Sequence, residues 1–376
     1  MPFDPQSPRP RHHRHGLVLG KCLPPHKGHL TLVRFAAALC DQVTVLVEER
    51  PDEEVPVDVR AAWLAQAVGD PRVTVVPLRG NHPQSPPGTP AGDASFWAHW
   101  RDTLHRAVPD ADAVVSTETY GRRLSEDLGV AWEPFEGARI VPIHATEIRN
   151  NPWDNWNWMV EPARANLVRR LVLIGPESTG KSQMSHTLAK LAEAPTLAVP
   201  EYAEDWIKRM APVKMDERAL HIFLHGQKAS REACLPYANR WIVEDSHALT
   251  TAVWARYLGL ANAEEAFTWA REDRPDHILL VSPHGVPWVP DAHRYSAEHR
   301  QDFFHMFKEA LDAWQFPYTV IEGNWDQRNA MALEAAHGLI QGWRQQSLRE
   351  WVPDHWRTVQ ADATLPPPPS RRPRPR

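Results

Sequence analysis

The segment GPESTGKS, residues 175–182, follows the apolar run 171–174 and precedes a stretch with helical pattern. It matches G-x-x-x-x-G-K-[ST], whose glycines let backbone N–H groups turn towards a phosphate. The motif works only between a strand and the N-terminus of a helix, which adds partial positive charge at that point. This part of the chain is therefore predicted to be an α/β domain with a nucleotide site.

The chemistry of this motif assigns a role to its residues. Lys181 is expected to reach the β- and γ-phosphates, and Ser182 to bind Mg²⁺. A chance glycine loop is the alternative, and both flanking elements disfavour it. The expected nucleotide-binding residues are Gly175, Pro176, Glu177, Ser178, Thr179, Gly180, Lys181 and Ser182.

Two carboxylates end apolar runs in the same half of the chain. Asp245 follows the run 241–243 and is a candidate second metal ligand and catalytic residue beside Lys181. A residue that caps the next helix is the alternative, because Asp is favoured there. Glu201 follows the run 197–199, and a hydroxyl acceptor needs a base. A surface carboxylate without function is the alternative for Glu201.

A second phosphate-binding pattern occurs about 150 residues earlier. The segment GKCLPPHKGH, residues 20–29, follows the apolar run 16–19. The turn at Gly20 and Lys21 directly after a strand favours a phosphate site, and His26 and His29 at a helix start can both face one phosphate. Zinc is the alternative, but no third or fourth ligand lies near in the sequence.

Short apolar runs alternate with helical stretches throughout the chain. Such alternation predicts an α/β protein of two domains, each with a doubly wound, mainly parallel sheet. In the first domain we expect strands at 17–19, 43–47, 73–77, 113–115 and 140–143. In the second domain, after the strand that precedes the glycine loop, we expect strands at 197–199, 241–243, 278–281 and 318–321. We expect helices at 28–39, 60–67, 96–107, 181–191, 216–235 and 297–314.

The pattern at residues 20–29 resembles that of the nucleotidyltransferase superfamily that contains nicotinamide-nucleotide adenylyltransferases. The superfamily's second motif, I-S-x-T-x-x-R, is matched by residues 143–149, IHATEIR, with His144 in place of serine. The order of motifs resembles the NadR-type bifunctional enzymes, in which a nicotinamide-mononucleotide (NMN) adenylyltransferase precedes a ribosylnicotinamide kinase. The resemblance runs from about residue 16 to about residue 344 and includes the segment STETYG at 116–121.

This resemblance implies a Rossmann-like nucleotidyltransferase domain and a P-loop kinase domain in one NAD salvage enzyme. The second domain would phosphorylate nicotinamide riboside with ATP and Mg²⁺, and the first would join the resulting NMN to AMP. His26, His29, Lys21 and Arg149 would be catalytic in the first domain. Further nucleotide-binding residues would be Gly20, Glu118, Tyr120 and Thr146, and the riboside would be bound by Glu201, Tyr202, Trp254, Trp288, Asp291 and Arg294. Arg294 or Arg300 would be the lid arginine.

Two departures from the family pattern leave alternatives open. Residues 283–286 lack the aspartate that usually precedes the Pro-Trp pair and place Gly285 there, and Glu204 stands where an arginine is common. The P-loop domain could therefore bind ATP as a sensor that regulates the adenylyltransferase. The first domain could also transfer a nucleotidyl group to another phosphorylated acceptor.

The predicted domain boundaries follow from these motifs. They are a disordered tail at 1–15, the nucleotidyltransferase domain at 16–150, a linker at 151–166, the kinase domain at 167–348 and a Pro/Arg-rich tail at 349–376. The three tryptophans of the linker suggest that it packs against another segment. Fifteen residues before Gly16 are too few for the helix-turn-helix repressor domain of some relatives, so we expect no repressor role.

Composition limits the partners and the cellular location that the sequence allows. A net charge of −5 gives no basic footprint for nucleic acid, and no apolar run is long enough to span a membrane. The first 15 residues lack the apolar core of a signal peptide, and the three cysteines have no metal-ligand spacing. We expect a cytoplasmic homo-oligomer whose partners are ATP, the riboside, NMN and NAD, with neither nucleic acid nor membrane among them.

Overall fold

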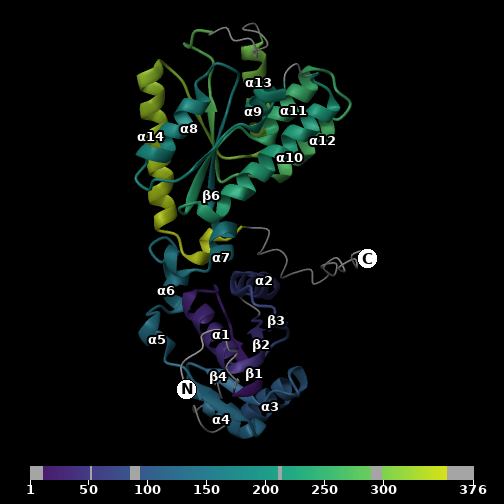
Figure 1. Cartoon of the computed structure of the whole chain (residues 1–376). Helices are drawn as coiled ribbons and strands as arrows, with labels where there is room; N and C mark the ends of the chain where they lie inside the picture. Colours follow the sequence, from purple (N-terminus) through teal and green to yellow (C-terminus); the bar gives the residue numbers. More distant parts are fainter. Residues whose placement is uncertain (1–11, 51–52, 85–93, 211–213, 289–298, 354–376) are drawn as a thin grey trace, which may run out of the picture. The chain divides into compact units, whose positions relative to one another are not determined.

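The computed structural model describes residues 12–50, 53–84, 94–210, 214–288 and 299–353, and Figure 1 labels many of their helices and strands. The contacts between residues divide the chain into two compact units. The first unit holds the described residues up to Ala163 and those from Gln346 onward, and the second holds Arg164–Gln345. The chain therefore returns to the first unit after completing the second.

The first unit is built on a five-stranded sheet in the order β3-β2-β1-β4-β5, with every pair parallel. The central strands are buried on both faces, as parallel sheets covered by helices require. Its strands are β1 (His13–Gly20), β2 (Cys40–Glu48), β3 (Val73–Leu78), β4 (Ala113–Ser116) and β5 (Ala131–Pro134). Its helices are α1 (Lys27–Leu39), α2 (Val57–Val68), α3 (Ala94–Ala107), α4 (Tyr120–Leu128), α5 (Gly137–Ile140), α6 (Ala145–Asn150), η1 (Trp156–Trp158) and α15 (Leu348–Trp351), and α7 (Glu161–Leu167) joins the two units.

The order of these strands positions a ligand site. The chain passes from β1 to β2 on one side and reaches β4 on the other side of β1. Ligands of open α/β sheets bind at such a switch point, beyond the carboxyl ends of the strands. The loop after β1, which carries the first phosphate-binding pattern, begins at this switch point.

The second unit has the same architecture with the order β10-β9-β6-β8-β7, again all parallel. Central β6 is fully buried over residues 171–174, and the glycine loop follows it. The strands are β6 (Arg169–Ile174), β7 (Ala198–Val199), β8 (Trp241–Asp245), β9 (His277–Val281) and β10 (Tyr318–Ile321). The helices are α8 (Lys181–Leu191), α9 (Tyr202–Met210), α10 (Glu217–Cys234), η2 (Leu235–Tyr237), α11 (Ala248–Tyr257), α12 (Ala263–Glu272), α13 (Arg300–Trp314) and α14 (Trp325–Arg344).

One predicted strand is wrong. Residues 140–143 do not join the sheet, because Ile140 ends α5 and the Val141 N–H bonds to Gly137. Pro142 has no N–H for a strand ladder. The fifth strand is β5, where the Trp132 indole donates to the Ser116 hydroxyl at 3.0 Å.

Regular secondary structure extends into both predicted tails. Strand β1 starts at His13, inside the expected tail 1–15, because His13 bonds to Glu133 and His15 bonds to Thr44, both at 2.8 Å. Helix α15 extends to Trp351, inside the expected tail 349–376. Burial of the Trp351 ring gives the residues of α15 an apolar contact.

The predicted linker, residues 151–166, belongs to the first unit as far as Ala163. Trp153 and Trp156 are both buried, and the ring of Trp351 lies 6.0 Å from each of their ring centroids. Helix α15 also contacts α6. The residues that precede and follow the second unit are thus joined by three aromatic rings.

We expect Trp351→Ala to destabilise the first unit by about 3–5 kcal/mol, because it removes a large buried ring and leaves a cavity. Thermal unfolding followed by calorimetry should show the transition of the first unit moving to lower temperature. Trp158→Ala is the matched control, since Trp158 is only half-buried. Equal shifts for the two variants would contradict a specific role for the buried ring.

Within the part of the chain that the structure describes, every helix is too short or too polar to cross a lipid bilayer.

Candidate functional site

The first phosphate-binding loop fixes both histidines by their backbone contacts. The His26 ring caps α1, with its Nδ1 accepting the Gly28 N–H at 3.1 Å. The Nδ1 of His29 accepts the His26 N–H at 3.2 Å, and the two rings lie 3.8 Å apart between centroids. Because each Nδ1 accepts a hydrogen bond, the proton of each neutral ring is on Nε2.

Burial keeps both imidazoles neutral. It lowers the pKa of His26 to about 4, with the neighbouring His144 acting in the same direction. It also lowers the pKa of His29 well below its usual value, and His26 adds to the effect. The predicted pair is therefore brought together as two neutral N–H donors rather than as two cations.

Gly28 is required by this arrangement. A Cβ at this position would lie 2.8 Å from Cε1 and 2.9 Å from Nδ1 of the His26 ring. Only a residue without a side chain lets the ring reach back to the N–H of residue 28. The spacing of HKGH thus has a steric cause as well as a chemical one.

Cations gather at the same loop. Burial lowers the pKa of Lys21, and Arg50 and Arg149 lower it further, whereas Glu48 and Glu53 raise it. Arg149 donates to the Leu23 carbonyl and to the Thr146 hydroxyl, both at 2.9 Å. The predicted residues of the second motif are therefore held against the first loop.

Arg60, which the sequence analysis missed, anchors the turn. Its guanidinium is fully buried and donates to three backbone carbonyls, those of Lys21, of Val55 at 2.9 Å and of Glu48 at 3.2 Å. It also pairs with Glu53, whose pKa burial raises to about 7 although Arg60 pulls it down. No local motif marks Arg60, since its partners lie up to 39 residues away.

The other predicted residues of the first unit occupy the neighbouring strand ends. Tyr120 donates to the Leu19 carbonyl at 3.2 Å, and burial raises the pKa of its hydroxyl. Glu118 is exposed, and its carbonyl accepts from the Ser116 hydroxyl at 3.0 Å. Gly20 ends β1, where an added Cβ would come no closer than 3.7 Å to the Cys22 sulfur.

The second loop has the backbone that the glycines of its motif predict. Gly175 has φ +152°, and an added Cβ would lie 2.4 Å from the Val281 carbonyl oxygen. Gly180 has φ +83°, and an added Cβ would meet the Trp325 ring at 2.5 Å. Thr179 donates its hydroxyl to the Pro176 carbonyl at 2.8 Å. The loop therefore approaches neighbouring atoms where only glycine fits.

The predicted charged residues converge behind this loop. Lys181 is buried and donates to the Pro176 carbonyl at 3.1 Å. Burial raises the pKa of Asp245, while Lys181 and a hydrogen bond with Ser182 lower it. Burial raises the pKa of Glu201 to about 7, with Lys181 opposing and Asp245 reinforcing the shift.

The side-chain oxygen atoms of Ser182 and Asp245 are suitable ligands for a hard divalent cation. Both offer oxygen, the ligand that Mg²⁺ prefers. Among the described residues, no hydrogen bond reaches Oδ1 of Asp245, although that atom is buried. The remaining residues of the loop, Glu177 and Ser178, lie in its turn, where Ser178 has φ 56°.

Two arginines that the sequence analysis did not assign to the loop support it. Arg300, expected only as a possible lid residue, donates to the Ser178 carbonyl at 3.3 Å and to Val286 at 3.1 Å. Arg328 is fully buried and donates to Thr179 at 3.4 Å, to Ser282 at 2.6 Å and to His284 at 2.8 Å. Long-range carbonyl contacts of this kind leave no pattern in the sequence.

The predicted riboside-binding residues are found in different environments. Trp254 is partly buried and packs against the core, with the Phe303 ring 4.7 Å away, and the Trp288 ring lies 5.7 Å from the Arg300 guanidinium. The Tyr202 ring packs on α10 at Gly226. Asp291 and Arg294 lie outside the described residues.

The departures from the family pattern have local structural roles. Glu204 pairs with Lys208 on the exposed face of α9 and raises the pKa of Glu201 slightly through its charge. Gly285 has φ +76° in the turn after β9. His144 caps the N-terminus of α6, where its N–H bonds to Glu147 at 3.1 Å, and it adds to the lowering of the pKa of His26.

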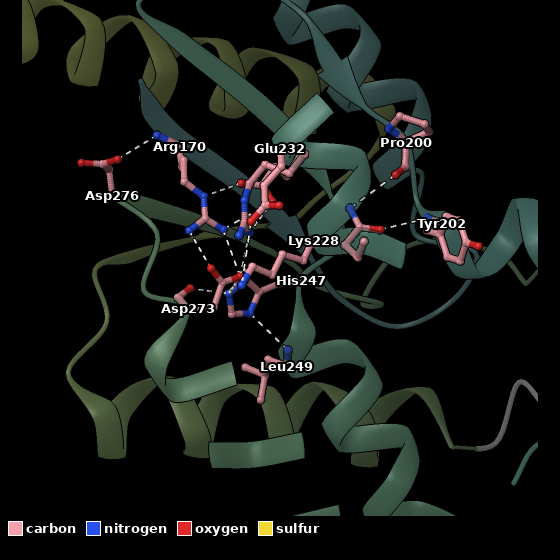
Figure 2. Close-up of polar contacts among 12 residues, drawn as sticks. Arg170, Pro200, Tyr202, Lys228, Glu232, His247, Leu249, Asp273 and Asp276 are labelled. Atoms are coloured by element: carbon pink, nitrogen blue, oxygen red, sulfur yellow. Dashed lines mark hydrogen bonds and ion pairs between the residues drawn. The ribbon is translucent and has the colours of Figure 1, made fainter. Parts of the chain in front are cut away.

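Figure 2 shows an ion network in the second unit that includes Arg170 and Asp273. Arg170 bonds to Glu244 at 2.6 Å and to Asp273 at 2.9 Å, and Arg231 bonds to Asp273 at 2.8 Å. Glu244 precedes Asp245 on β8, so the two carboxylates point to opposite faces of the sheet. The network fixes the strand that presents Asp245.

The chain is similar in sequence to one family model and to two curated proteins. A family model described as "AAA domain" matches residues 170–328. The trifunctional NAD biosynthesis/regulator protein NadR of Escherichia coli K12 is 24% identical over 357 residues, which cover 86% of this chain and 83% of that protein. The protein of the same name from Salmonella typhimurium LT2 gives the same identity and shares.

Two solved structures share the fold. A NadR protein in complex with NR aligns with a TM-score of 0.70 and 19% identity, over 87% of this chain and 96% of that one. A NadR protein in complex with NAD and AMP-PNP aligns with the same score and identity, over 90% and 98%. The chain is thus an α/β protein with two five-stranded parallel sheets, which shares its fold with solved NadR proteins over most of its length and has an AAA-type P-loop domain in its C-terminal half.

Proposed function

Because the chain is a homologue of the NadR-type proteins over most of its length and carries an AAA-type P-loop domain, we propose that it makes NAD from nicotinamide riboside in two ATP-dependent steps. The second unit phosphorylates the riboside to NMN, and the first unit adenylylates NMN. The observation that supports this proposal is that two loops with phosphate-binding sequence patterns each follow the carboxyl end of a central strand, with different chemical groups around them. The product of one step is the substrate of the other.

In the first unit the acceptor is already an anion. A 5′-phosphate oxygen of NMN attacks the α-phosphorus of ATP, the bond to the β-phosphate breaks, and pyrophosphate leaves. Because no proton has to be removed, the protein's task is to position the phosphates and to stabilise negative charge. The Nε2–H groups of His26 and His29, together with Lys21 and Arg149, are the donors and cations for this task.

In the second unit the acceptor is a hydroxyl. The 5′-oxygen of the riboside attacks the γ-phosphorus, ADP leaves, and the hydroxyl proton passes to Glu201. Lys181 neutralises the phosphates, and Ser182 and Asp245 would hold Mg²⁺, which supplies charge stabilisation on the triphosphate when bound. Tyr202, Trp254 and Trp288 are proposed to bind the riboside together with Asp291 and Arg294.

A mass spectrum of the products tests both steps at once. The protein is incubated with ATP, Mg²⁺ and nicotinamide riboside, and NMN, ADP, NAD and pyrophosphate are expected to appear. ATP binding without any NMN would contradict the kinase step and favour a regulatory ATP sensor. Formation of NMN but no NAD, even with NMN supplied, would contradict the adenylyltransferase step.

The rate of NMN formation should rise with pH between 6 and 8. Glu201 acts as a base only when ionised, and its pKa of about 7 places the change in that range. Below that range, kcat/KM should fall by about tenfold per pH unit. Measurement of kcat/KM at fixed free Mg²⁺ checks this, and Glu201→Gln should remove this acid limb. An unchanged limb in that variant would assign it to another group.

A further inference from the structure

Gln227 on α10 holds the turn that carries Glu201. Its side-chain Oε1 accepts the Tyr202 N–H at 2.9 Å, and its Nε2 donates to the Pro200 carbonyl at 3.4 Å. Figure 2 shows these two contacts reaching Pro200 and Tyr202 from one side chain. The amide of Gln227 therefore bonds to the backbone immediately before and immediately after Glu201.

The surrounding packing leaves this amide little freedom. Gln227 is buried, and both ends of its amide bond to this turn. The preceding residue is Gly226, where an added Cβ would lie 2.0 Å from the Tyr202 ring. Gly226 thus leaves space for the Tyr202 ring, and Gln227 hydrogen-bonds to the backbone on both sides of Glu201.

The helix that bears Gln227 is also tied to the strand that bears Asp245. Arg231, one helical turn further along α10, bonds to Glu244 at 3.5 Å and to Asp273 at 2.8 Å. Glu244 lies next to Asp245 on β8. One face of α10 therefore contacts the immediate neighbours of both carboxylates at the proposed kinase site.

We propose that Gln227 is a positioning residue that fixes the Glu201 carboxylate relative to Asp245 and Lys181, and so sets the rate of phosphoryl transfer. This inference rests on the proposed kinase function of the second unit. A misplacement of a catalytic group by about 1 Å can cost about 10²-fold in rate. Both hydrogen bonds of the Gln227 side chain go to backbone atoms of the turn, so its effect passes through the neighbouring Glu201 and Tyr202, and a double-mutant cycle isolates the part that passes through Glu201.

The test is a double-mutant cycle in the full-length protein. Gln227→Met keeps the length of the side chain but loses both hydrogen bonds, and kcat for NMN formation should fall about 10- to 100-fold. The KM values for ATP and riboside should change far less than kcat. In the Glu201→Gln background, the same substitution should cause no further loss of kcat, because the group that it positions is absent.

Two controls separate positioning from damage to the fold. Lys228→Ala changes the next residue on α10, which pairs with Glu232 at the surface, and should leave kcat unchanged. Gln227→Ala serves as a second variant if the methionine variant unfolds, because it leaves room for water at the two backbone groups. Adenylyl transfer from supplied NMN should persist in every variant but reports only on the first unit. Calorimetric unfolding and ATP binding therefore report that the second unit of each variant is folded.

A readout without turnover follows the carboxyl of Glu201 itself. In ¹³C-labelled protein, Gln227→Met should move the pKa of Glu201 from about 7 towards its ordinary value. The turn opens to water, and the loss of burial, the largest cause of the raised pKa, outweighs the weaker influence of Lys181, which lowers it, while Asp245, Glu204 and Glu177 raise it less. An unchanged Glu201 titration, or equal losses of kcat with and without Glu201, would overturn the inference. Wild-type protein that forms no NMN would instead refute the proposed function, while the titration would still test Gln227.

Discussion

His29→Ala is expected to lower pyrophosphate release from ATP and NMN by about 10²- to 10³-fold, the loss typical of removing one donor that stabilises developing charge. Burial keeps the His29 ring neutral, and the His26 N–H occupies its Nδ1. The Nε2–H is therefore the group available to a phosphate. Phosphorylation of the riboside should stay within about twofold, because it depends on a separate loop. A coupled pyrophosphate assay and an ADP assay on the same preparation measure the two effects.

His29→Gln is the matched variant for this prediction. Glutamine at the third position of a helix can bond back to the N–H of the capping residue, as His29 does to His26. Stability should therefore stay closer to wild type than in His29→Ala, while pyrophosphate release stays strongly reduced. Full activity of His29→Gln would show that the residue only caps α1. Loss of both activities in folded protein would refute the assignment of two separate sites.

The features that the sequence predicted correctly are local ones. Glycine loops between an apolar run and a helix identified the ends of β1 and β6 and the start of α8 at Lys181. Each of these predictions needs only neighbouring residues, because a strand, a turn and a capped helix are set by short-range sterics and hydrogen bonds. The placement of His26 beside His29 follows from the same short segment.

The features that the sequence did not predict depend on distant partners. Arg60 reaches Lys21 across 39 residues and Arg328 reaches Thr179 across 149, so neither leaves a pattern in a short window. The strand β5 was missed because AWEP has only four residues, and the apolar run 140–143 competed with it. The burial of Trp351 was missed because its ring packs against residues about 200 positions earlier.

The catalytic environment of the second unit was predicted in part. Residue types and strand ends selected Lys181, Glu201 and Asp245, and the structure brings their charges into mutual range. The raised pKa of Glu201 could not be predicted, since it comes from burial beside Asp245. Gln227 was not selected because a glutamine that bonds to backbone looks like any other helical glutamine.

Lys181→Met should reduce NMN formation by about 10²- to 10³-fold, because it removes the charge that offsets the transferring phosphoryl group. Methionine keeps the length of the side chain in a site where Lys181 is buried, so the loss reports charge more than packing. Conversion of supplied NMN to NAD should remain at the wild-type rate. Steady-state measurement of both reactions, each with its own acceptor, tests the two expectations.

The same substitution has a consequence for pH that separates loss of charge from loss of fold. Lys181 lowers the pKa of both Glu201 and Asp245, so its removal should raise both further above their ordinary values. The residual kinase rate should then require a higher pH than wild type, with the acid limb moved above about 7. Lys181→Arg keeps the charge and should keep that limb near its wild-type position even if the rate falls. A limb that stays in place in Lys181→Met would show that Glu201 and Lys181 do not act on one another, and would remove the basis for placing them in one site.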